Sequence, residues 1–309
     1  MNRLFWGAVS ALMLAAPGAW AQLGGAKPIG FETRSADGTP LNLTGFVFEP
    51  PEPAKSAVVL LLSSAGMSDA VQGHYGRELS KDGHLVLALD SFTPRKISRT
   101  VNDQSQIGSM QMALDALLAR EFIASAYPAV KRFAVMGFSK GGLASLFAAD
   151  RRFHSARSQR FDAYLALYPS CAFAAKNPRP SGPVLMLFGA KDDYSGVEPC
   201  LQWAERFKSA GGAIEAKVYP DAHHSFDGDP SLTTPLYLAR AENFLRCLVL
   251  LEDDGQWSYQ GKRYPDQLAT YPDLVKTCVR RGASIATNLK AKAAATDDAK
   301  AFLRSSLLR

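Results

Sequence analysis

The stretch Gly137-Phe138-Ser139-Lys140-Gly141 holds a serine whose hydroxyl could act as a nucleophile. It follows an apolar run at residues 131–136, typical of a buried strand, and it precedes a helical pattern at residues 142–150. The spacing is the G-x-S-x-G pattern of a nucleophile elbow, in which a tight strand-to-helix turn raises the serine above the sheet edge. The flanking glycines let the neighbouring backbone pass without a clash. The sequence therefore predicts nucleophilic catalysis by Ser139.

A serine hydroxyl needs a base to remove its proton and a carboxylate to orient that base. In folds with this elbow the chain order is serine, then acid, then histidine. Of the five histidines, His223 and His224 follow the last predicted strand, where the base is expected. Asp192 and Asp193 stand just after an apolar strand between the serine and these histidines. A solvated turn is the alternative interpretation of the paired aspartates.

Strands that alternate with helices must position these groups. Two strands are expected in an N-terminal hairpin, at residues 31–34 and 41–48, and apolar runs predict six more at 57–62, 84–89, 131–136, 163–168, 183–188 and 213–219. Helices are expected at 71–81, 105–127, 142–150, 197–209 and 235–251. This alternation predicts an α/β fold with a mostly parallel, doubly wound sheet, whose ligands bind at the carboxyl ends of the strands.

Four stretches together resemble the dienelactone hydrolase family of α/β hydrolases, and its secreted members in particular. They are Gly137–Gly142, Leu89–Arg95, Phe188–Asp192 and Tyr219–Phe226, and the resemblance spans roughly residues 55–250. The family's acid stands three residues after the strand-end glycine, which implies Asp192. Its base precedes a small residue and a phenylalanine, which implies His224. Founding members carry cysteine where this chain has Ser139, and this departure favours a general serine esterase over a dienelactone hydrolase.

The resemblance also implies positions for the groups that bind the substrate. An oxyanion hole needs one backbone N–H from the residue after the nucleophile, here Lys140, and a second from the loop after the third strand. Ala65 is assigned to the second position, and its neighbour Ser64 is the alternative. Arg95 lies in a loop where some members use an arginine to bind a substrate carboxylate, and a surface arginine is the alternative role.

The first 21 residues have the pattern of a secretory signal peptide. Arg3 provides the positive charge, an apolar run follows to Leu14, and Ala19-Trp20-Ala21 offers the small residues of a cleavage site before Gln22. The apolar run is shorter than the ~20 residues of a membrane span. We therefore expect a periplasmic or secreted protein that is cut after Ala21.

The four cysteines suit an oxidising compartment. Cys171 and Cys200 follow consecutive strands and are expected to pair, which leaves Cys247 to pair with Cys278. Four free, buried thiols are the alternative. The chain has no CxxC or HExxH spacing, so neither a metal site nor a cofactor is predicted.

The positive charge is concentrated near the C-terminus, where residues 261–309 hold ten Lys and Arg against four Asp. This basic tail could contact an anionic envelope surface, or it could be the solvated face of helices. Aromatic residues do not alternate with the basic ones as in a nucleic-acid stacking platform, so no nucleic-acid partner is predicted. The expected organisation is a signal peptide at 1–21, an α/β-hydrolase domain at 22–252 and a basic helical extension at 253–309.

Together these features predict an exported serine hydrolase that cleaves small-molecule carboxylic esters or lactones through an acyl-enzyme. Ser139 would attack, His224 would transfer protons and Asp192 would orient the imidazole. A peptidase or amidase with the same three residues is one alternative. A non-catalytic envelope-binding protein on the same fold is the other.

Overall fold

The computed structural model describes residues 23–34, 38–154 and 160–308. Its central feature is an eight-stranded sheet in the order β1-β2-β4-β3-β5-β6-β8-β9. The strands are β1 (Lys27–Arg34), β2 (Pro40–Phe48), β3 (Ser56–Leu61), β4 (His84–Asp90), β5 (Arg132–Phe138), β6 (Ala163–Leu167), β8 (Val184–Gly189) and β9 (Ile214–Tyr219). The first two pairs in this order are antiparallel, and the other pairs are parallel. The predicted α/β architecture with an N-terminal hairpin is confirmed.

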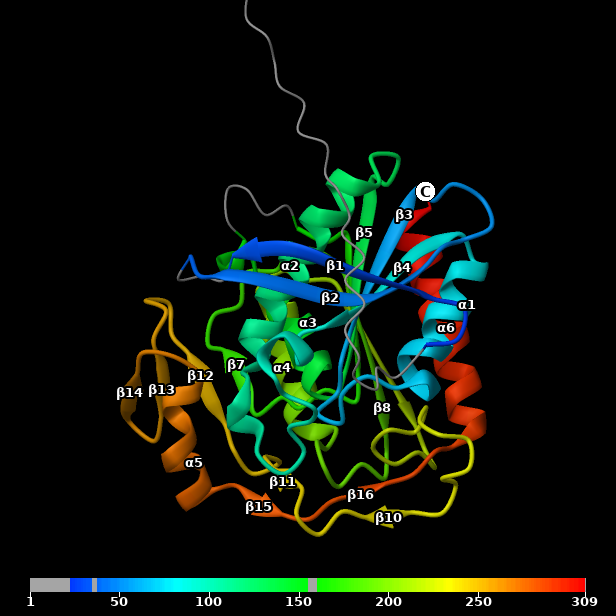
Figure 1. Cartoon of the computed structure of the whole chain (residues 1–309). Coiled ribbons are helices and arrows are strands. Elements are labelled where there is room, and N and C mark those ends of the chain that lie inside the picture. The colour runs from blue at the N-terminus through cyan, green and yellow to red at the C-terminus, as the bar shows by residue number, and fades with distance from the viewer. Residues whose placement is uncertain (1–22, 35–37, 155–159, 309) are drawn as a thin grey trace, which may run out of the picture.

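Helices cover both faces of this sheet (Figure 1). One face carries α2 (Ser109–Ala126), α3 (Lys140–Ala148) and α4 (Glu198–Ser209), and the other carries α1 (His74–Lys81) and α6 (Leu289–Leu307). Every residue of β3, β4, β6 and β8 is buried, because both faces of these central strands are covered. This explains why the central strands read as continuous apolar runs in the sequence.

The helix predicted at residues 235–251 is wrong. This segment instead forms three short strands, β10 (Leu236–Tyr237), β11 (Glu242–Asn243) and β12 (Val249–Leu251). Its backbone groups bond to distant segments: Glu242 N–H donates to Val101, and Leu238 N–H donates to Ala283. The physical reason is competition for one surface, since α6 covers the sheet face on which a helix at 235–251 would have packed.

Two segments cross the carboxyl ends of the sheet strands, and we call them the strap: residues 236–243 and 280–285. Within the strap, β10 pairs with β16 (Ser284–Ile285), and β11 pairs with β15 (Arg280–Arg281). Figure 1 shows these four short strands along the lower edge of the molecule. The strap therefore covers the edge of the sheet where ligands bind in such folds.

Both disulfides expected from the sequence are formed. Cys171 joins Cys200, which connects the segment after β6 to α4, and Cys247 joins Cys278 just outside the two halves of the strap. A disulfide limits the conformations of the unfolded chain and so stabilises the fold.

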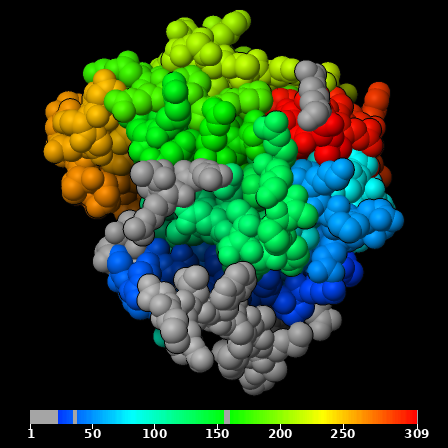
Figure 2. All heavy atoms as spheres, turned by 90° about the horizontal axis from the view of Figure 1, so that it is seen from above, coloured from blue at the N-terminus to red at the C-terminus, as the bar shows by residue number. Residues whose placement is uncertain are grey.

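The C-terminal part is docked on the rest of the protein. A second, four-stranded sheet contains β12, β7 (Phe173–Ala175), β13 (Trp257–Tyr259) and β14 (Lys262–Tyr264), and α5 (Tyr271–Thr277) follows it. The lobe around β13 and β14 (orange) and α6 (red) lie on opposite sides of the molecule in Figure 2. The boundary expected at residue 252 stays a prediction.

The predicted signal peptide, residues 1–21, lies outside the described residues. Among the residues that are described, no helix has both the length and the hydropathy that crossing a bilayer requires.

Candidate active site

Ser139 occupies the turn between β5 and α3, with a backbone φ of 52°. Positive φ is uncommon in a non-glycine residue and often marks a functional site. The flanking glycines are required here, because a Cβ on Gly137 would overlap the Gly141 carbonyl and a Cβ on Gly141 would overlap the Leu62 carbonyl. Ser139 N–H donates to the Leu167 carbonyl at 2.9 Å, which fixes the turn to β6. The strand–turn–helix context of a nucleophile elbow is therefore present.

His224 lies within hydrogen-bond distance of both expected partners. Its Nε2 is 3.0 Å from Ser139 Oγ, and its Nδ1 is 2.8 Å from Asp192 Oδ2. All three residues are buried, with 9% or less of their surface exposed. A neutral imidazole with its proton on Nδ1 can bond to the carboxylate and still accept a proton from the serine at Nε2.

The backbone of its own loop holds Asp192 in place. The N–H groups of Tyr194 and Ser195 both donate to Asp192 Oδ1 at 2.8 Å, while Oδ2 faces His224. Burial acts to raise the pKa of Asp192, but His224 and these two N–H groups outweigh it and hold the pKa below 3.8. Asp192 is therefore ionised near neutral pH, as an orienting carboxylate must be.

The neighbours of these two residues have other roles. Asp193 Oδ1 accepts a hydrogen bond from Ser284 N–H at 2.8 Å, which attaches the acid loop to the strap. His223 Nδ1 is buried and has no hydrogen-bond partner among the described residues. Of the paired aspartates and paired histidines, only Asp192 and His224 therefore form a chain with Ser139.

A second serine also approaches the imidazole. Ser195 Oγ is 3.4 Å from His224 Nδ1, the nitrogen that already faces Asp192. A serine nucleophile must give its proton to the nitrogen that is not bonded to the carboxylate. Ser139 meets this condition and Ser195 does not, so Ser195 is placed to orient His224.

Two tyrosine rings pack against His224. The Tyr168 ring lies 4.8 Å from the imidazole centroid and the Tyr194 ring 4.7 Å. The Tyr168 hydroxyl donates to Asp227 at 2.6 Å, and both of these residues are buried. These contacts restrict the orientation of the imidazole beyond what Asp192 and Ser195 provide.

Two backbone N–H groups were expected to form the oxyanion hole. Lys140 is the first residue of α3, where an N–H has no partner within the helix and is free for a ligand. Ala65 N–H donates to Ser63 Oγ at 3.2 Å, so this group is engaged in the structure. Ser64, the alternative donor, belongs to the same loop after β3 and is buried.

Arg95 has a partner within the protein that was not predicted. Its two terminal nitrogens bond to both oxygens of Asp115 in α2, at 2.8 and 2.9 Å, and one also donates to the Ser91 carbonyl. Asp115 is fully buried, and a buried carboxylate needs such a partner. Arg95 therefore joins the loop after β4 to α2, and its role as a clamp for a substrate carboxylate stays a prediction.

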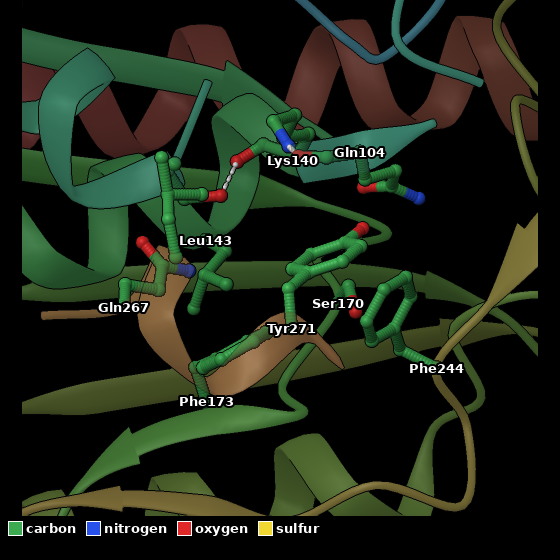
Figure 3. A pocket seen from close by; sticks show the side chains of 11 residues that line it. Gln104, Lys140, Leu143, Ser170, Phe173, Phe244, Gln267 and Tyr271 are labelled. Atoms are coloured by element: carbon green, nitrogen blue, oxygen red, sulfur yellow. Dashed lines mark hydrogen bonds between the residues drawn. The ribbon is translucent and has the colours of Figure 1, made fainter. Parts of the chain in front are cut away.

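A small cavity of about 20 Å³ lies beside the elbow (Figure 3). Its lining mixes polar side chains with the rings of Phe173, Phe244 and Tyr271. The Lys140 side chain reaches this cavity and donates to the Gln104 carbonyl at 3.0 Å. Burial lowers the pKa of Lys140 to about 7, against the opposing influence of Glu242 and Asp103.

Glu242 connects this cavity to the strap. It is buried and accepts hydrogen bonds from Gln104 N–H at 2.7 Å and from the Tyr271 hydroxyl at 3.0 Å, and it forms an ion pair with Arg281. The cavity itself is lined by residues of the loop after β4, of α2 and α3, of the segment from Ser170 to Phe173, and of the chain around α5, together with Phe244 next to the strap. Among residues 23–34, 38–154 and 160–308, no group of three or more His, Cys, Asp or Glu side chains could hold a metal ion.

Comparison with known proteins shows to which family this chain belongs. The model of the dienelactone hydrolase family matches residues 43–243, which is more than half of the chain. The chain belongs to the dienelactone hydrolase family. Together with the hydrogen-bonded Ser139, His224 and Asp192, this membership makes the chain a serine hydrolase of dienelactone hydrolase type. The resemblance inferred from four short stretches is confirmed.

Individual relatives are distant from this member of the dienelactone hydrolase family. A protein of Saccharolobus solfataricus named "Putative carboxymethylenebutenolidase" is 24% identical over 58% of this chain and 82% of its own. Esterase 2 of Thermogutta terrifontis, phosphoramylated by tabun, aligns with a TM-score of 0.53 and 17% identity over 68% of this chain and 88% of its own. The propionate-bound form of that esterase gives a TM-score of 0.51 at 16% identity over the same shares. These structural likenesses show a shared fold.

Several residues of the site were not predicted from the sequence. Tyr194 and Ser195 follow Asp192 by two and three residues, and their N–H groups donate to its side chain. Aspartate side chains often accept such bonds in turns, so this local pattern could have predicted that both residues lie at the site. Tyr168, Gln104 and Glu242 carry no such signal, because their contacts with the site depend on how distant segments pack.

Proposed function

We propose that this protein is an exported serine esterase that hydrolyses carboxylic esters or lactones of small molecules through an acyl-enzyme. The observation that carries the proposal is the chain of hydrogen bonds from Ser139 through His224 to Asp192, with the serine on the turn between β5 and α3. A nucleophile, a base and an orienting acid in this order are what acyl transfer needs.

The reaction would proceed in two halves. Ser139 Oγ attacks the ester carbonyl carbon while its proton moves to His224 Nε2, and the carbonyl electron pair becomes an oxyanion. Lys140 N–H and a second N–H from Ser64 or Ala65 stabilise that charge. When the oxyanion collapses, the bond to the alcohol breaks and His224 protonates the leaving oxygen. Water then attacks the acyl-enzyme by the same route and regenerates Ser139.

Two considerations support an ester of a small acid. The nucleophile is a serine, where founding members of the family carry a cysteine. The Thermogutta terrifontis relative is called an esterase and is described with propionate bound. The arginine expected to bind a second carboxylate is engaged by Asp115 instead, so we propose neutral, short acyl groups as the preferred class.

Export is the second part of the proposal. The pattern at residues 1–21 and the two disulfides both suit a protein that is secreted to the periplasm or beyond, because disulfides persist in oxidising compartments. Contact of the basic tail with an anionic envelope surface stays a prediction. Several of its cations, including Lys300 and Arg304, form ion pairs within the protein.

The decisive experiment compares Ser139→Ala with Ser195→Ala. Both remove a hydroxyl near His224, but only Ser139 faces Nε2. With p-nitrophenyl butyrate, we expect Ser139→Ala to lower kcat on the order of 10⁶-fold and to abolish labelling by a fluorophosphonate. Ser195→Ala should keep most of the activity and the labelling. Labelling that survives in Ser139→Ala and disappears in Ser195→Ala would overturn the assignment.

Matched anilides should be poor substrates of the wild type, and faster anilide than ester cleavage would favour an amidase.

A further inference from the structure

The strand β9 (Ile214–Tyr219) forms one edge of the central sheet, and among the described strands it pairs only with β8. Its four middle residues, Glu215–Val218, are all exposed, whereas every residue of the neighbouring strands β6 and β8 is buried. An uncovered edge strand presents a row of backbone N–H and C=O groups that another strand can bind. β9 is therefore an interaction surface that the hydrolytic site does not explain.

The hydrogen bonds to β8 decide which backbone groups of β9 face outward. The carbonyls of Ala213 and Tyr219, just before and at the end of β9, accept hydrogen bonds from β8 and from the residue after it, at 3.0 and 2.9 Å. Successive residues of a strand direct their backbone groups to opposite sides, so the odd-numbered residues face β8. Ile214, Ala216 and Val218 therefore present their N–H and C=O groups at the open edge.

The charged side chains of β9 lie on one face of the strand. Lys217 Nζ and the Tyr219 hydroxyl both donate to Asp298 of α6, at 2.6 and 2.8 Å. Because side chains alternate along a strand, Glu215 lies on this same face. Glu215 has no hydrogen-bond or ion-pair partner among the described residues. One exposed carboxylate of the edge thus lacks a partner, and it stands two residues from an exposed lysine.

The sequence of β9 is complementary to itself. When a second copy of β9 lies antiparallel with a two-fold axis at Ala216, Glu215 is opposite the partner's Lys217. In the same register Ile214 is opposite the partner's Val218. Pairs of opposite charge and pairs of β-branched side chains are favourable directly across an antiparallel ladder. The symmetry of the pair makes each of these contacts twice.

The backbone and the charges select the same register. With the axis at Ala216, all three outward-facing residues exchange hydrogen bonds with the second copy. An axis at Ile214 or Val218 would place much of each strand beyond the end of the other. An axis at Glu215 or Lys217 would set that charge opposite its own copy, which is unfavourable. Only the axis at Ala216 satisfies both conditions.

We propose that β9 is the interface of a dimer, in which two copies of this chain join through antiparallel β9 strands with the two-fold axis at Ala216. Each copy has one β9, so association ends at the dimer. The other edge strand, β1, is a poor alternative because it contains Pro28, which has no N–H to donate. The dimer also lies close to the active site, since the loop with His224 follows β9.

Sedimentation velocity over a concentration series tests whether the dimer forms. We expect a reversible equilibrium between monomer and dimer for the wild type, with no larger species at the upper end of the series. Protein that stays monomeric throughout would overturn the proposal. Species that keep growing beyond the dimer would also overturn it, because a two-fold interface is closed.

Two charge variants test the register. Glu215→Lys sets a lysine opposite the partner's Lys217, and Lys217→Glu sets a glutamate opposite the partner's Glu215. Like charges at both pairs should raise the Kd of each variant by about tenfold or more. An equimolar mixture of the two variants should form heterodimers with a Kd close to that of the wild type, because both pairs then carry opposite charges again. A mixture that dissociates as readily as the separate variants would contradict this register.

Glu32→Lys is the matched control, because it makes the same change on the exposed residue Glu32 of β1, at the opposite edge of the sheet. Its Kd should equal that of the wild type, and equal Kd values for Glu215→Lys and Glu32→Lys would place the interface elsewhere. Lys217→Glu also loses the bond to Asp298. If thermal unfolding shows that this variant does not fold, the comparison of Glu215→Lys with Glu32→Lys decides.

A backbone variant tests the hydrogen bonds independently of charge. Ala216→Pro removes the N–H at the two-fold axis, and that group faces away from β8, so the bonds within the sheet are kept. We expect this variant to be monomeric in sedimentation velocity. A dimer that persists in folded Ala216→Pro would show that the copies do not join through β9.

Discussion

Lys140 takes part in the site in two ways. Its backbone N–H lies at the start of α3, next to the nucleophile, and its side chain is buried beside Gln104 and Glu242. Burial of an ammonium group is unfavourable unless it is compensated, and the single hydrogen bond to the Gln104 carbonyl compensates only in part. The residue therefore makes stability near the nucleophile depend on pH.

The sign of this dependence follows from the pKa of Lys140, which burial lowers from 10.5 to about 7 in the folded protein. Between these values the unfolded chain binds the proton and the folded protein does not, so this residue makes the free energy of unfolding rise with pH. Below pH 7, Lys140 is protonated in the folded and in the unfolded protein, and the burial of its charge then destabilises the fold most strongly. We expect Lys140→Met to raise Tm relative to the wild type by more at pH 6 than at pH 9, as measured by thermal unfolding.

Lys131→Met is the control for this measurement, because Lys131 is exposed at the start of the segment before β5. Its Tm relative to the wild type should be the same at both pH values. A Lys140→Met variant that shifts Tm equally at pH 6 and pH 9 would contradict the lowered pKa.

A variant of Arg95 can show whether this residue stabilises the fold or binds the substrate. Arg95→Met would leave the buried Asp115 carboxylate without its partner, and breaking such a pair typically costs about 3–5 kcal/mol. We expect this loss in the free energy of unfolding by urea, and a partial recovery when Asp115→Leu is added. If Arg95→Met is as stable as the wild type and loses only the turnover of acidic esters, Arg95 binds the carboxylate of the substrate and its role is not structural.

At the scale of elements, α6 completes the second face of the sheet. Ala291, Ala295, Ala299, Leu303 and Leu307 recur every four residues, are buried, and belong to the same apolar cluster as β3, β5 and α1. The helix at residues 289–307 thus covers the central strands, while residues 236–243, which follow the catalytic histidine, form part of the strap.

This arrangement predicts a large cost for truncating α6 side chains. Leu303 is fully buried, so Leu303→Ala should lower the free energy of unfolding by about 3 kcal/mol through the cavity it leaves. Leu308→Ala is the matched control, because Leu308 is 48% exposed and should change stability by less than about 0.5 kcal/mol. Equal effects of the two variants in urea unfolding would show that α6 is not docked as described.

At the scale of the whole molecule, distant segments are joined around the site. The disulfide Cys247–Cys278 lies just outside the strap and joins the chain next to its two segments, and Asp193 attaches the strap to the acid loop. The strap residue Glu242 bonds to Gln104 in the loop after β4 and to Tyr271 of α5, and both of these residues line the cavity beside the elbow. Disulfides persist in oxidising compartments, so these two disulfides are consistent with the export that we propose.

The proposed export predicts a defined N-terminus for the mature protein. When the full chain is produced in a bacterium with a periplasm, we expect the purified protein to begin at Gln22, as measured by intact mass and N-terminal sequencing. Ala21→Trp should block processing, because the position before the cut needs a small residue. A purified wild-type protein that still begins at Met1 would contradict the signal peptide.

Much of the fold and the triad could be predicted because the signals are local. The buried strands read as continuous apolar runs, and their ends carry the serine, the aspartate and the histidine in a fixed chain order. The small number of histidines left few candidates for the base. Choosing Asp192 over Asp193, and His224 over His223, required the family pattern, since adjacent residues share almost the same local context.

The sequence by itself determined the sheet, the elbow and the order of the catalytic residues, because each depends on side-chain periodicity and neighbouring residues. Only the tertiary structure decided that 235–251 forms part of a strap, that Arg95 binds Asp115, and that the Tyr194 ring packs against His224. Each of these depends on which of several distant segments occupies one shared surface. Which segment occupies the surface depends on packing and on the partners available to buried polar groups, and a local sequence pattern does not contain this information.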